Sequence, residues 1–339
     1  MIAMLPRLAT ADIKANRAVG LGRVVWRALL CVASMCVLNA PSAALDHVHF
    51  TVGTNPGGGY EQAARSLGQA MLDAGVARTV AYENKAGAGG TIALAHFVNG
   101  QRGQGSALIV TGAVMIGAIL QNKPPVALSD ATPIARLFHE YNVFVVPANS
   151  PIKSMKDLID LLKKDPGAIT WGGGSRGSID QISIAHIARA VGVEPNKVNY
   201  VPFQGGGEAS AAIVGGHVTV GASGWAELAP FIKSGKVRAL AITAATRLPG
   251  NSTPTLKELG LDVVFENWRG IYAAPGITAA QQRAITRAIT AATKQKSWLD
   301  ALSSSAWTPA LLIGEDFEKF VAAEHLRIDA SMRVVGLVK

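Results

Sequence analysis

The sequence predicts an α/β protein whose open parallel sheets carry helices on both faces. One unit recurs along the chain: a short β-rich run, a turn rich in glycine or other small residues, and an amphipathic helix. Repetition of this unit is typical of parallel sheets. Of the 339 residues, 49% are hydrophobic and only 16% are charged, a composition that indicates a globular protein with a large core. The chain is long enough for two domains of ordinary size.

Residues 1–44 have the charge and hydropathy order of a secretory signal peptide. Basic residues up to Arg27 precede an apolar run that ends near Leu38, and small residues follow to Ala44. The apolar run is much shorter than the ~20 residues that a bilayer span needs. We therefore expect export to the periplasm and cleavage near Ala44. Both cysteines, Cys31 and Cys36, lie in this segment, so the mature chain would contain no disulfide.

The first predicted units follow this segment directly. Strands are expected over residues 48–54, 80–83 and 107–111, and the turns after them are Asn55–Gly59, Asn84–Gly90 and Gly112. Helices should begin near Tyr60 and Thr91, since apolar residues then recur at helical spacing. Ligands of open α/β sheets bind beyond the carboxyl ends of the strands, so we expect the site at these turns.

The second half repeats the pattern before it becomes mainly helical. A helix over 154–163 should be capped by Ser154 with Asp157. Short strands over 144–147, 169–171, 199–203 and 218–221 precede the small-residue turns 172–178, 204–207 and 222–224. Further helices are predicted over residues 225–233, 279–294, 297–303 and 315–335.

Charge and motif content exclude several classes of function. Lysine and arginine exceed the acidic residues by 9 in the whole chain and by 5 after residues 1–44, a mild excess that favours an anionic ligand. Nucleic-acid binding is not expected, because no basic stripe with interleaved aromatic residues is present. No histidine or cysteine cluster has the spacing of zinc ligands, so we expect neither a metal nor a cofactor.

The turn Gly172-Gly173-Gly174-Ser175-Arg176-Gly177 matches three known patterns. It contains G-x-G-x-x-G, but it follows a very short strand in mid-chain, which argues against a dinucleotide site. It also contains G-x-S-x-G, so an exported serine hydrolase that uses Ser175 is the alternative function. Its partners would be Glu208 or Glu227 and His325, but no oxyanion motif precedes the turn.

The third interpretation is an anion site, and it is the one we favour. Free backbone N–H groups at a helix N-terminus, with the Ser175 and Ser178 hydroxyls, would bind a carboxylate. This interpretation also explains why residues 55–59 and 87–90 form turns of the same design. The alternative is that the glycines only permit tight turns between strand and helix. We therefore expect a binding protein, not an enzyme.

Several motifs together resemble the periplasmic receptors of tripartite tricarboxylate transporters, also called Bug-type receptors. The resemblance covers residues ~46 to ~335. The matching segments are Pro56–Glu61, Glu83–Gly90, Asn149–Leu158 and Gly173–Asp180, and Gly205–Ala209 with Asn267–Gly270 fits the branch that binds citrate.

This resemblance implies a two-lobed periplasmic-binding-protein fold of the second type, with the ligand in the cleft between the lobes. Lobe 1 would comprise residues 45–145 and 271–339, and lobe 2 residues 146–270, with the chain crossing near 144–147 and 269–273. A monomer would bind a small organic carboxylate, a tricarboxylate such as citrate or a dicarboxylate, and deliver it to a membrane permease. The ligand-binding residues that the motifs imply are Asn55, Gly58, Gly59, Tyr60, Glu61, Ser175, Arg176, Gly177, Ser178, Asp180 and Arg269.

Departures from the family pattern fall at positions expected to line the site. Glu61 stands where the family usually has aspartate, and Arg176 and Ser178 stand where it has small residues. Citrate, a four-carbon dicarboxylate and an aromatic acid therefore all remain open. Arg176 is predicted to set ligand choice by pairing with a carboxylate; the alternative is that it points to solvent.

Overall fold

A computed structural model describes residues 45–339, and the predicted signal peptide lies outside these residues. The described residues form a ten-stranded sheet with the order β2-β1-β3-β9-β4-β7-β5-β6, while β8 and β10 also pair with β4. The strands are β1 (Leu45–Val52), β2 (Ala77–Asn84), β3 (Ala107–Gly112), β4 (Thr132–Pro147), β5 (Thr170–Gly173), β6 (Asn199–Pro202), β7 (Val220–Gly224), β8 (Val237–Ile242), β9 (Glu266–Ala273) and β10 (Thr308–Ile313).

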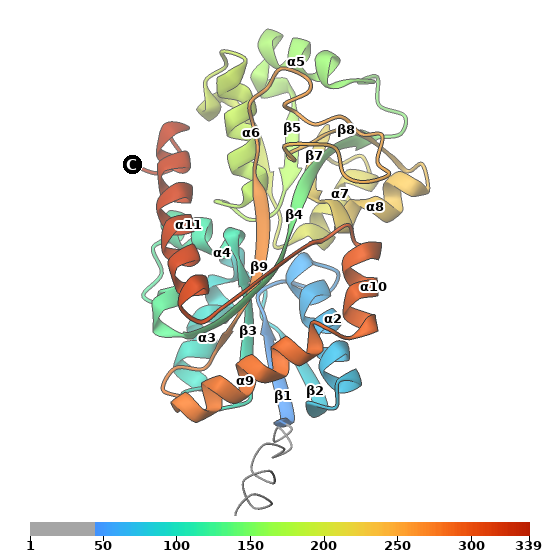
Figure 1. Cartoon of the computed structure of the whole chain (residues 1–339). Helices are drawn as coiled ribbons and strands as arrows, with labels where there is room; N and C mark the ends of the chain where they lie inside the picture. The colour runs from blue at the N-terminus through green and yellow to red at the C-terminus, as the bar shows by residue number, and fades with distance from the viewer. Residues whose placement is uncertain (1–44) are drawn as a thin grey trace, which may run out of the picture. The chain divides into compact units, whose positions relative to one another are not determined.

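Helices follow most of these strands, as the sequence predicts (Figure 1). They are α2 (Gly59–Asp73), α3 (Thr91–Gly100), α4 (Ala113–Asn122), α5 (Met155–Lys164), α6 (Ile179–Ala190), α7 (Gly206–Val214), α8 (Trp225–Lys233), α9 (Ala279–Ala292), α10 (Lys296–Ser304) and α11 (Gly314–Val334). The predicted cap of α5 is confirmed, because Ser154 accepts from the Asp157 N–H and Asp157 accepts from the Ser154 N–H.

Strand β4 is shared by two groups of strands (Figure 1). Up to Tyr141 it pairs with β9 and β10, and from Asn142 it pairs with β7 and β8. Strand β9 pairs with β4 along its whole length from Glu266. The crossings expected near 144–147 and 269–273 stay predictions.

The prediction of purely parallel sheets is wrong, because the sheet is mixed. The pairs β1–β2, β1–β3, β5–β6 and β5–β7 are parallel, but β4, β8, β9 and β10 pair antiparallel. The sequence did not predict β8, β9, β10 or the first part of β4. Strand β9 is buried from Asn267 to Ala273, and a strand buried on both faces lacks the alternation that marks an amphipathic strand.

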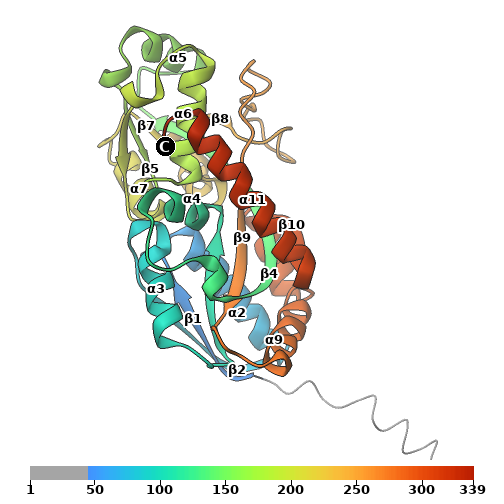
Figure 2. The same ribbon diagram turned by 90° about the vertical axis from the view of Figure 1, so that its left-hand side faces the viewer.

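Helix α11 contacts elements from both strand groups. It packs against β4 and α4, and its last turns meet α6 through His186 Nε2 and Ser331 Oγ, 2.7 Å apart. Arg189 of α6 also donates to the Val334 carbonyl at 3.0 Å. Figure 2 shows α11 running past β9 and β4 toward α6. Among residues 45–339, every helix is too short or too polar to cross a membrane.

Candidate functional site

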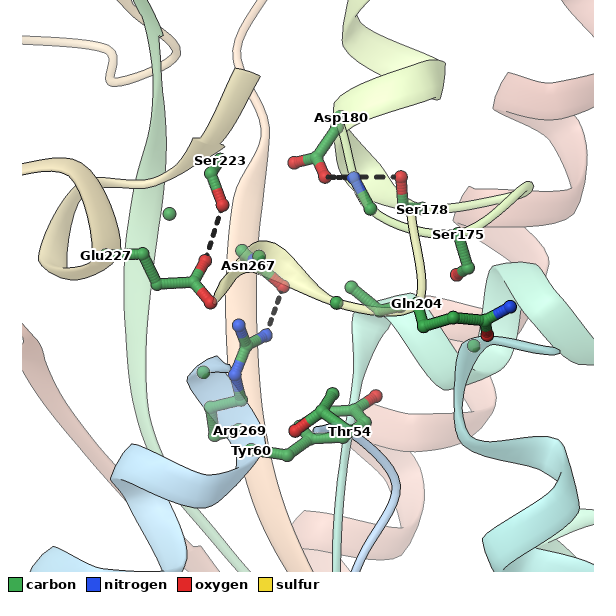
Figure 3. Close-up of a pocket in the computed structure, with 17 residues that line it drawn as sticks. Thr54, Tyr60, Ser175, Ser178, Asp180, Gln204, Ser223, Glu227, Asn267 and Arg269 are labelled. Carbon is green, nitrogen blue, oxygen red and sulfur yellow. Dashed lines mark hydrogen bonds between the residues drawn. The ribbon is translucent and has the colours of Figure 1, made fainter. Parts of the chain in front are cut away.

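A cavity lies where the carboxyl ends of β1, β5, β6 and β7 meet β9 (Figure 3). Its volume is about 40 Å³, far below the roughly 300 Å³ at which small-molecule sites begin. The cavity is lined by Thr54, Gly59, Tyr60, Gly89, Val114, Gly174, Ser175, Ser178, Asp180, Gln204, Gly205, Gly206, Ser223, Gly224, Glu227, Asn267 and Arg269.

Four helices begin at this cavity. Gly59 and Gly206 are the first residues of α2 and α7, while Ser178 and Gly224 are the N-cap residues of α6 and α8. The first N–H groups of a helix have no partner within it, and the helix dipole places positive charge at this end. Their convergence makes the cavity favourable for an anion.

Two glycines leave the space that the polar side chains occupy. A Cβ atom on Gly59 would lie 2.6 Å from Nη2 of Arg269. Gly89 has a φ of +66°, and a Cβ there would lie 2.7 Å from Oγ of Ser175. Larger residues at either position would displace a group that faces the cavity.

Arg269 supplies the positive charge in the cavity wall. Its Nη2 lies 3.0 Å from Oε1 of Glu140, and the two side chains are only 4% and 1% exposed. Arg269 also donates to Asn267 Oδ1 (Figure 3), and its guanidinium lies over the Tyr60 ring. Burial raises the pKa of Glu140 to about 7 despite the neighbouring arginine. Nε of Arg269 is buried and has no hydrogen-bond partner among the described residues.

Asp180 stabilises the turn of residues 172–178, the second glycine-rich loop, by accepting hydrogen bonds from it. It accepts from the Gly174 N–H at 2.7 Å, from the Asn142 amide, and weakly from the Ser178 hydroxyl at 3.4 Å. Burial raises its pKa to about 7. These donors hold the loop against the start of α6, so Asp180 positions the backbone groups of the loop.

Glu227, in the first turn of α8, is a second acid in the cavity wall. Oε2 accepts from the Ser223 hydroxyl at 2.5 Å, and burial raises the pKa of the carboxyl group. Its Oε1 is buried, and the backbone N–H groups of Gly59 and Gly224 partly offset the rise in the pKa of the carboxyl group.

Three hydroxyl groups of the cavity wall also lack partners within residues 45–339. They belong to Thr54, Tyr60 and Ser175. A buried polar group without a partner costs stability unless water or a ligand satisfies it. All three can donate hydrogen bonds, which suits a ligand with acceptor oxygens.

The structure brings six of the predicted site residues to this cavity and places five around it. Those that line it are Gly59, Tyr60, Ser175, Ser178, Asp180 and Arg269. Outside the cavity, Asn55 donates a hydrogen bond to Glu208, and Gly58 is the N-cap residue of α2. Glu61 pairs with Arg65 and accepts from the Gly57 N–H. Arg176 is exposed, and the Gly177 N–H donates to Gln181. Their roles in binding stay predictions.

Sequence reasoning missed several residues of the cavity. It recognised the turns at 87–90, 204–207 and 222–224 but selected no ligand contact from them. Gly89, Gln204, Gly205, Gly206, Ser223, Gly224 and Glu227 line the cavity from these turns and from the first turn of α8. The strand–turn–helix rule that selected the other two loops would have found them. Thr54, Val114, Gly174 and Asn267 were missed as well.

The constellation of a serine hydrolase is not assembled. Oγ of Ser175 is buried and has no partner among residues 45–339, and the cavity lining contains no histidine. His325 instead lies on α11, beside an apolar groove that includes Ile116 and Tyr272. Ser175 therefore has no base to activate it.

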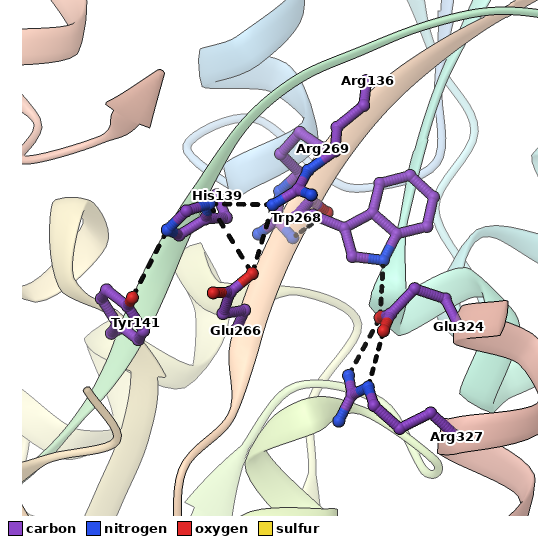
Figure 4. A network of polar contacts seen from close by, with 8 residues as sticks. All are labelled: Arg136, His139, Tyr141, Glu266, Trp268, Arg269, Glu324 and Arg327. Carbon is purple, nitrogen blue, oxygen red and sulfur yellow. Dashed lines mark hydrogen bonds and ion pairs between the residues drawn. The ribbon is translucent and has the colours of Figure 1, made fainter. Parts of the chain in front are cut away.

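The strands that carry Glu140 and Arg269 hold a second polar network through neighbouring residues (Figure 4). Nη2 of Arg136 lies 2.9 Å from Nδ1 of His139 and 3.2 Å from Glu266. The Trp268 indole donates to Glu324 of α11 at 3.1 Å. Successive residues of a strand point to opposite faces, so this network ties the strands to α11 while Arg269 faces the cavity.

Comparison with protein families gives a match over most of the described chain. The profile of the family described as "Tripartite tricarboxylate transporter family receptor" matches residues 63–337. BugT of Bordetella pertussis is 25% identical over 288 residues, which cover 83% of this chain and 86% of that protein. A protein of Cupriavidus necator, "UPF0065 protein in gbd 5'region", is 29% identical over 200 residues, 58% of this chain and 59% of that protein.

Solved structures show the same fold. The periplasmic binding protein BugD superposes with a TM-score of 0.80 at 21% identity, over 87% of this chain and 99% of BugD. MatC from Rhodopseudomonas palustris with bound malate gives 0.72 at 23% identity, over 87% and 99% of the two chains. An R. palustris protein with adipate gives 0.76 at 21%, over 88% and 99%. The predicted two-lobed periplasmic-binding-protein fold is thereby confirmed.

Proposed function

The chain belongs to the tripartite tricarboxylate transporter receptor family, and from that premise we propose that it captures a small organic carboxylate and delivers it to a membrane permease. Receptors of this family bind substrates for transport and are not enzymes. We propose that the mature protein works in the periplasm as a monomer, after a signal peptide over residues 1–44 has been removed.

One observation carries the carboxylate proposal. The N-termini of α2, α6, α7 and α8 converge on a cavity whose wall holds Arg269 and three unpartnered hydroxyl groups. Each of these features stabilises an anion, and together they offer more donors than one carboxylate needs. Malate and adipate in the two structural relatives support an acid with two carboxylates, and citrate remains a candidate.

We also propose that residues 45–145 with 271–339 and residues 146–270 act as two lobes that close on the ligand. Asn55 of the proposed first lobe donates a hydrogen bond to Glu208 of the proposed second lobe, a contact expected of a closed state. Small-angle scattering should show a smaller radius of gyration when ligand is added. An unchanged radius at saturation would argue for a rigid cleft.

A thermal-shift screen of the mature protein against ~100 organic acids tests the function. Ligand at a hundred times its Kd should stabilise the protein by ~2.7 kcal/mol, and calorimetry on each hit would give the stoichiometry. We expect one carboxylate per chain. A screen in which no acid raises the melting temperature would contradict the proposal, as would hydrolysis of esters by the purified protein.

A further inference from the structure

The Glu227 carboxyl group takes up space in the cavity that a ligand would need. The cavity volume of about 40 Å³ has room for a few water molecules, whereas small-molecule sites begin at roughly 300 Å³. A Cβ atom on Gly206 would lie 2.1 Å from Oε1 and 2.2 Å from Oε2 of Glu227, so the carboxyl group packs directly against the start of α7. A dicarboxylate cannot share the cavity with the side chain in this position.

The same carboxyl group lies among donors that favour an anion (Figure 3). The Ser223 hydroxyl donates to Oε2 at 2.5 Å. Burial raises the pKa of the group, but the Ser223 hydroxyl and the Arg269 guanidinium act in the other direction. So do the backbone N–H groups of Gly59, the first residue of α2, and of Gly224, the N-cap residue of α8. Helix N-termini and Arg269 are also the groups proposed to bind the ligand carboxylate.

We propose that Glu227 is an internal competitor of the ligand, whose carboxylate occupies the anion site at the start of α2 until a ligand carboxylate displaces it. This inference rests on the proposed carboxylate receptor and concerns the regulation of its site. Glu227 belongs to the proposed second lobe and Gly59 to the first, so the competing contact forms when the lobes are together. Glu227 is partly exposed, and the displaced side chain can turn toward solvent.

A competitor within the chain lowers the affinity for every ligand that uses the same donors. The apparent affinity falls with the fraction of molecules whose site is open to the ligand. An acid with several carboxylates replaces the contacts of Glu227 and adds others, whereas a smaller anion gains less from the exchange. The competitor therefore favours acids that fill the whole site.

The alternative is that Glu227 only caps α8. It is the third residue of that helix, the position from which a glutamate or glutamine side chain accepts from the N-cap N–H. A cap needs the Gly224 N–H alone and does not require the carboxyl group to lie against Gly206 or to meet Gly59. The two roles differ in their effect on binding, because the loss of a cap does not make a ligand bind more tightly.

Calorimetry at pH 7.5 with succinate, malate, adipate and citrate tests the inference. Glu227→Gln keeps a side chain that can cap α8 but removes the charge that competes with an anion. We expect the tightest of the four acids to bind this variant at least threefold more tightly than the wild type. Glu227→Ala removes the competing group altogether and should show the same gain. A melting curve of each variant shows whether it is folded before its binding is compared.

Glu194→Gln is the matched control. Glu194 is exposed, pairs with Lys197 at 3.4 Å and lies outside the cavity. The same charge change there should leave Kd within twofold of the wild type, so a general effect of net charge on anion binding would be detected.

The outcomes separate the inference from the proposed function. A gain below threefold, or weaker binding, in both folded Glu227 variants would overturn the inference alone and leave Glu227 as a helix cap. A gain of the same size in Glu194→Gln would also overturn it. Failure of all four acids to bind the wild type and the folded Glu227 variants would overturn the inference and the proposed function together.

Discussion

The second glycine-rich loop and strand β9 each contain an arginine that the sequence predicts to bind the ligand, but the two arginines differ in burial and in hydrogen bonding. Arg176, in the loop, is exposed, and no ion pair joins it to another described residue. Arg269, in β9, is 4% exposed and is held by Glu140 and Asn267. The comparison shows which kind of element supplies charge to this cavity and which supplies backbone donors.

A loop of small residues brings its backbone close to a ligand, whereas its one long side chain can point into solvent. A central strand has neighbours on both sides that can hold a charged side chain in one direction. Glu140 does this for Arg269 from the adjacent strand β4. The difference predicts large effects for changes in β9 and small ones for changes in the loop.

The largest effect is expected for Arg269→Met. The variant leaves the Glu140 carboxylate buried without its cation, and breaking a buried pair typically costs 3–5 kcal/mol. Arg247→Met is the control, because Arg247 pairs with Glu258 at 2.9 Å on the surface, and such a pair contributes about 0–1 kcal/mol. Urea unfolding of both variants measures the difference. A loss below ~1 kcal/mol for Arg269→Met would show that the buried pair is not what holds β9 to β4.

The pH dependence of stability tests the same pair. The pKa of Glu140 rises from 4.5 to about 7 on folding, so the folded state binds its proton more tightly than the unfolded state. Stability should therefore fall as pH rises from about 4.5 to about 7, by ~3 kcal/mol at 1.36 kcal/mol per pKa unit. Asp180 acts in the same direction.

The variant Glu140→Gln isolates this contribution. Half-buried His139 and His186 have lowered pKa values and act in the opposite direction below about pH 6.5, so the readout is the difference in stability between variant and wild type. The stability of Glu140→Gln should therefore fall less than that of the wild type between pH 5 and pH 8. Parallel stability curves would contradict the raised pKa.

The contrast between loop and strand also explains what sequence reasoning reached. Local signals located the Ser154 cap, the helix Trp225–Lys233 and the turns that line the cavity, because these depend on residues a few positions apart. The partner of Arg269 lies 129 residues away in the chain, and no local pattern reports such a pairing. The antiparallel pairing of β9 was missed for the same reason.

Ser175→Ala should have an intermediate effect, on binding and not on folding. Its hydroxyl is buried without a partner among the described residues, and a hydrogen bond from it to a carboxylate contributes ~1.5–3 kcal/mol. We expect Kd for the best acid to rise roughly 10- to 150-fold while the melting temperature without ligand stays constant. A Kd within twofold of the wild type would place the carboxylate away from the α6 end of the cavity.

Arg176→Ala should have the smallest effect on ligand affinity. It tests whether the loop contributes positive charge to ligand binding. Arg176 is exposed and outside the cavity lining, so a long-range attraction is screened by salt and contributes ~0–1 kcal/mol. That corresponds to less than about a fivefold change in Kd.

The prediction that Arg176 pairs with a second carboxylate requires the opposite. Truncating a buried bidentate contact costs 2–5 kcal/mol, and the loss would be confined to di- and tricarboxylates. Calorimetry of Arg176→Ala with the best diacid and its monoacid, at low and high salt, separates the two cases. A small, salt-sensitive loss shared by both acids would make Arg176 a surface charge that attracts anions to the cleft. A large, salt-insensitive loss for the diacid alone would mean that the loop moves Arg176 into the cavity when ligand binds, and Arg269 would then share the charge of the site.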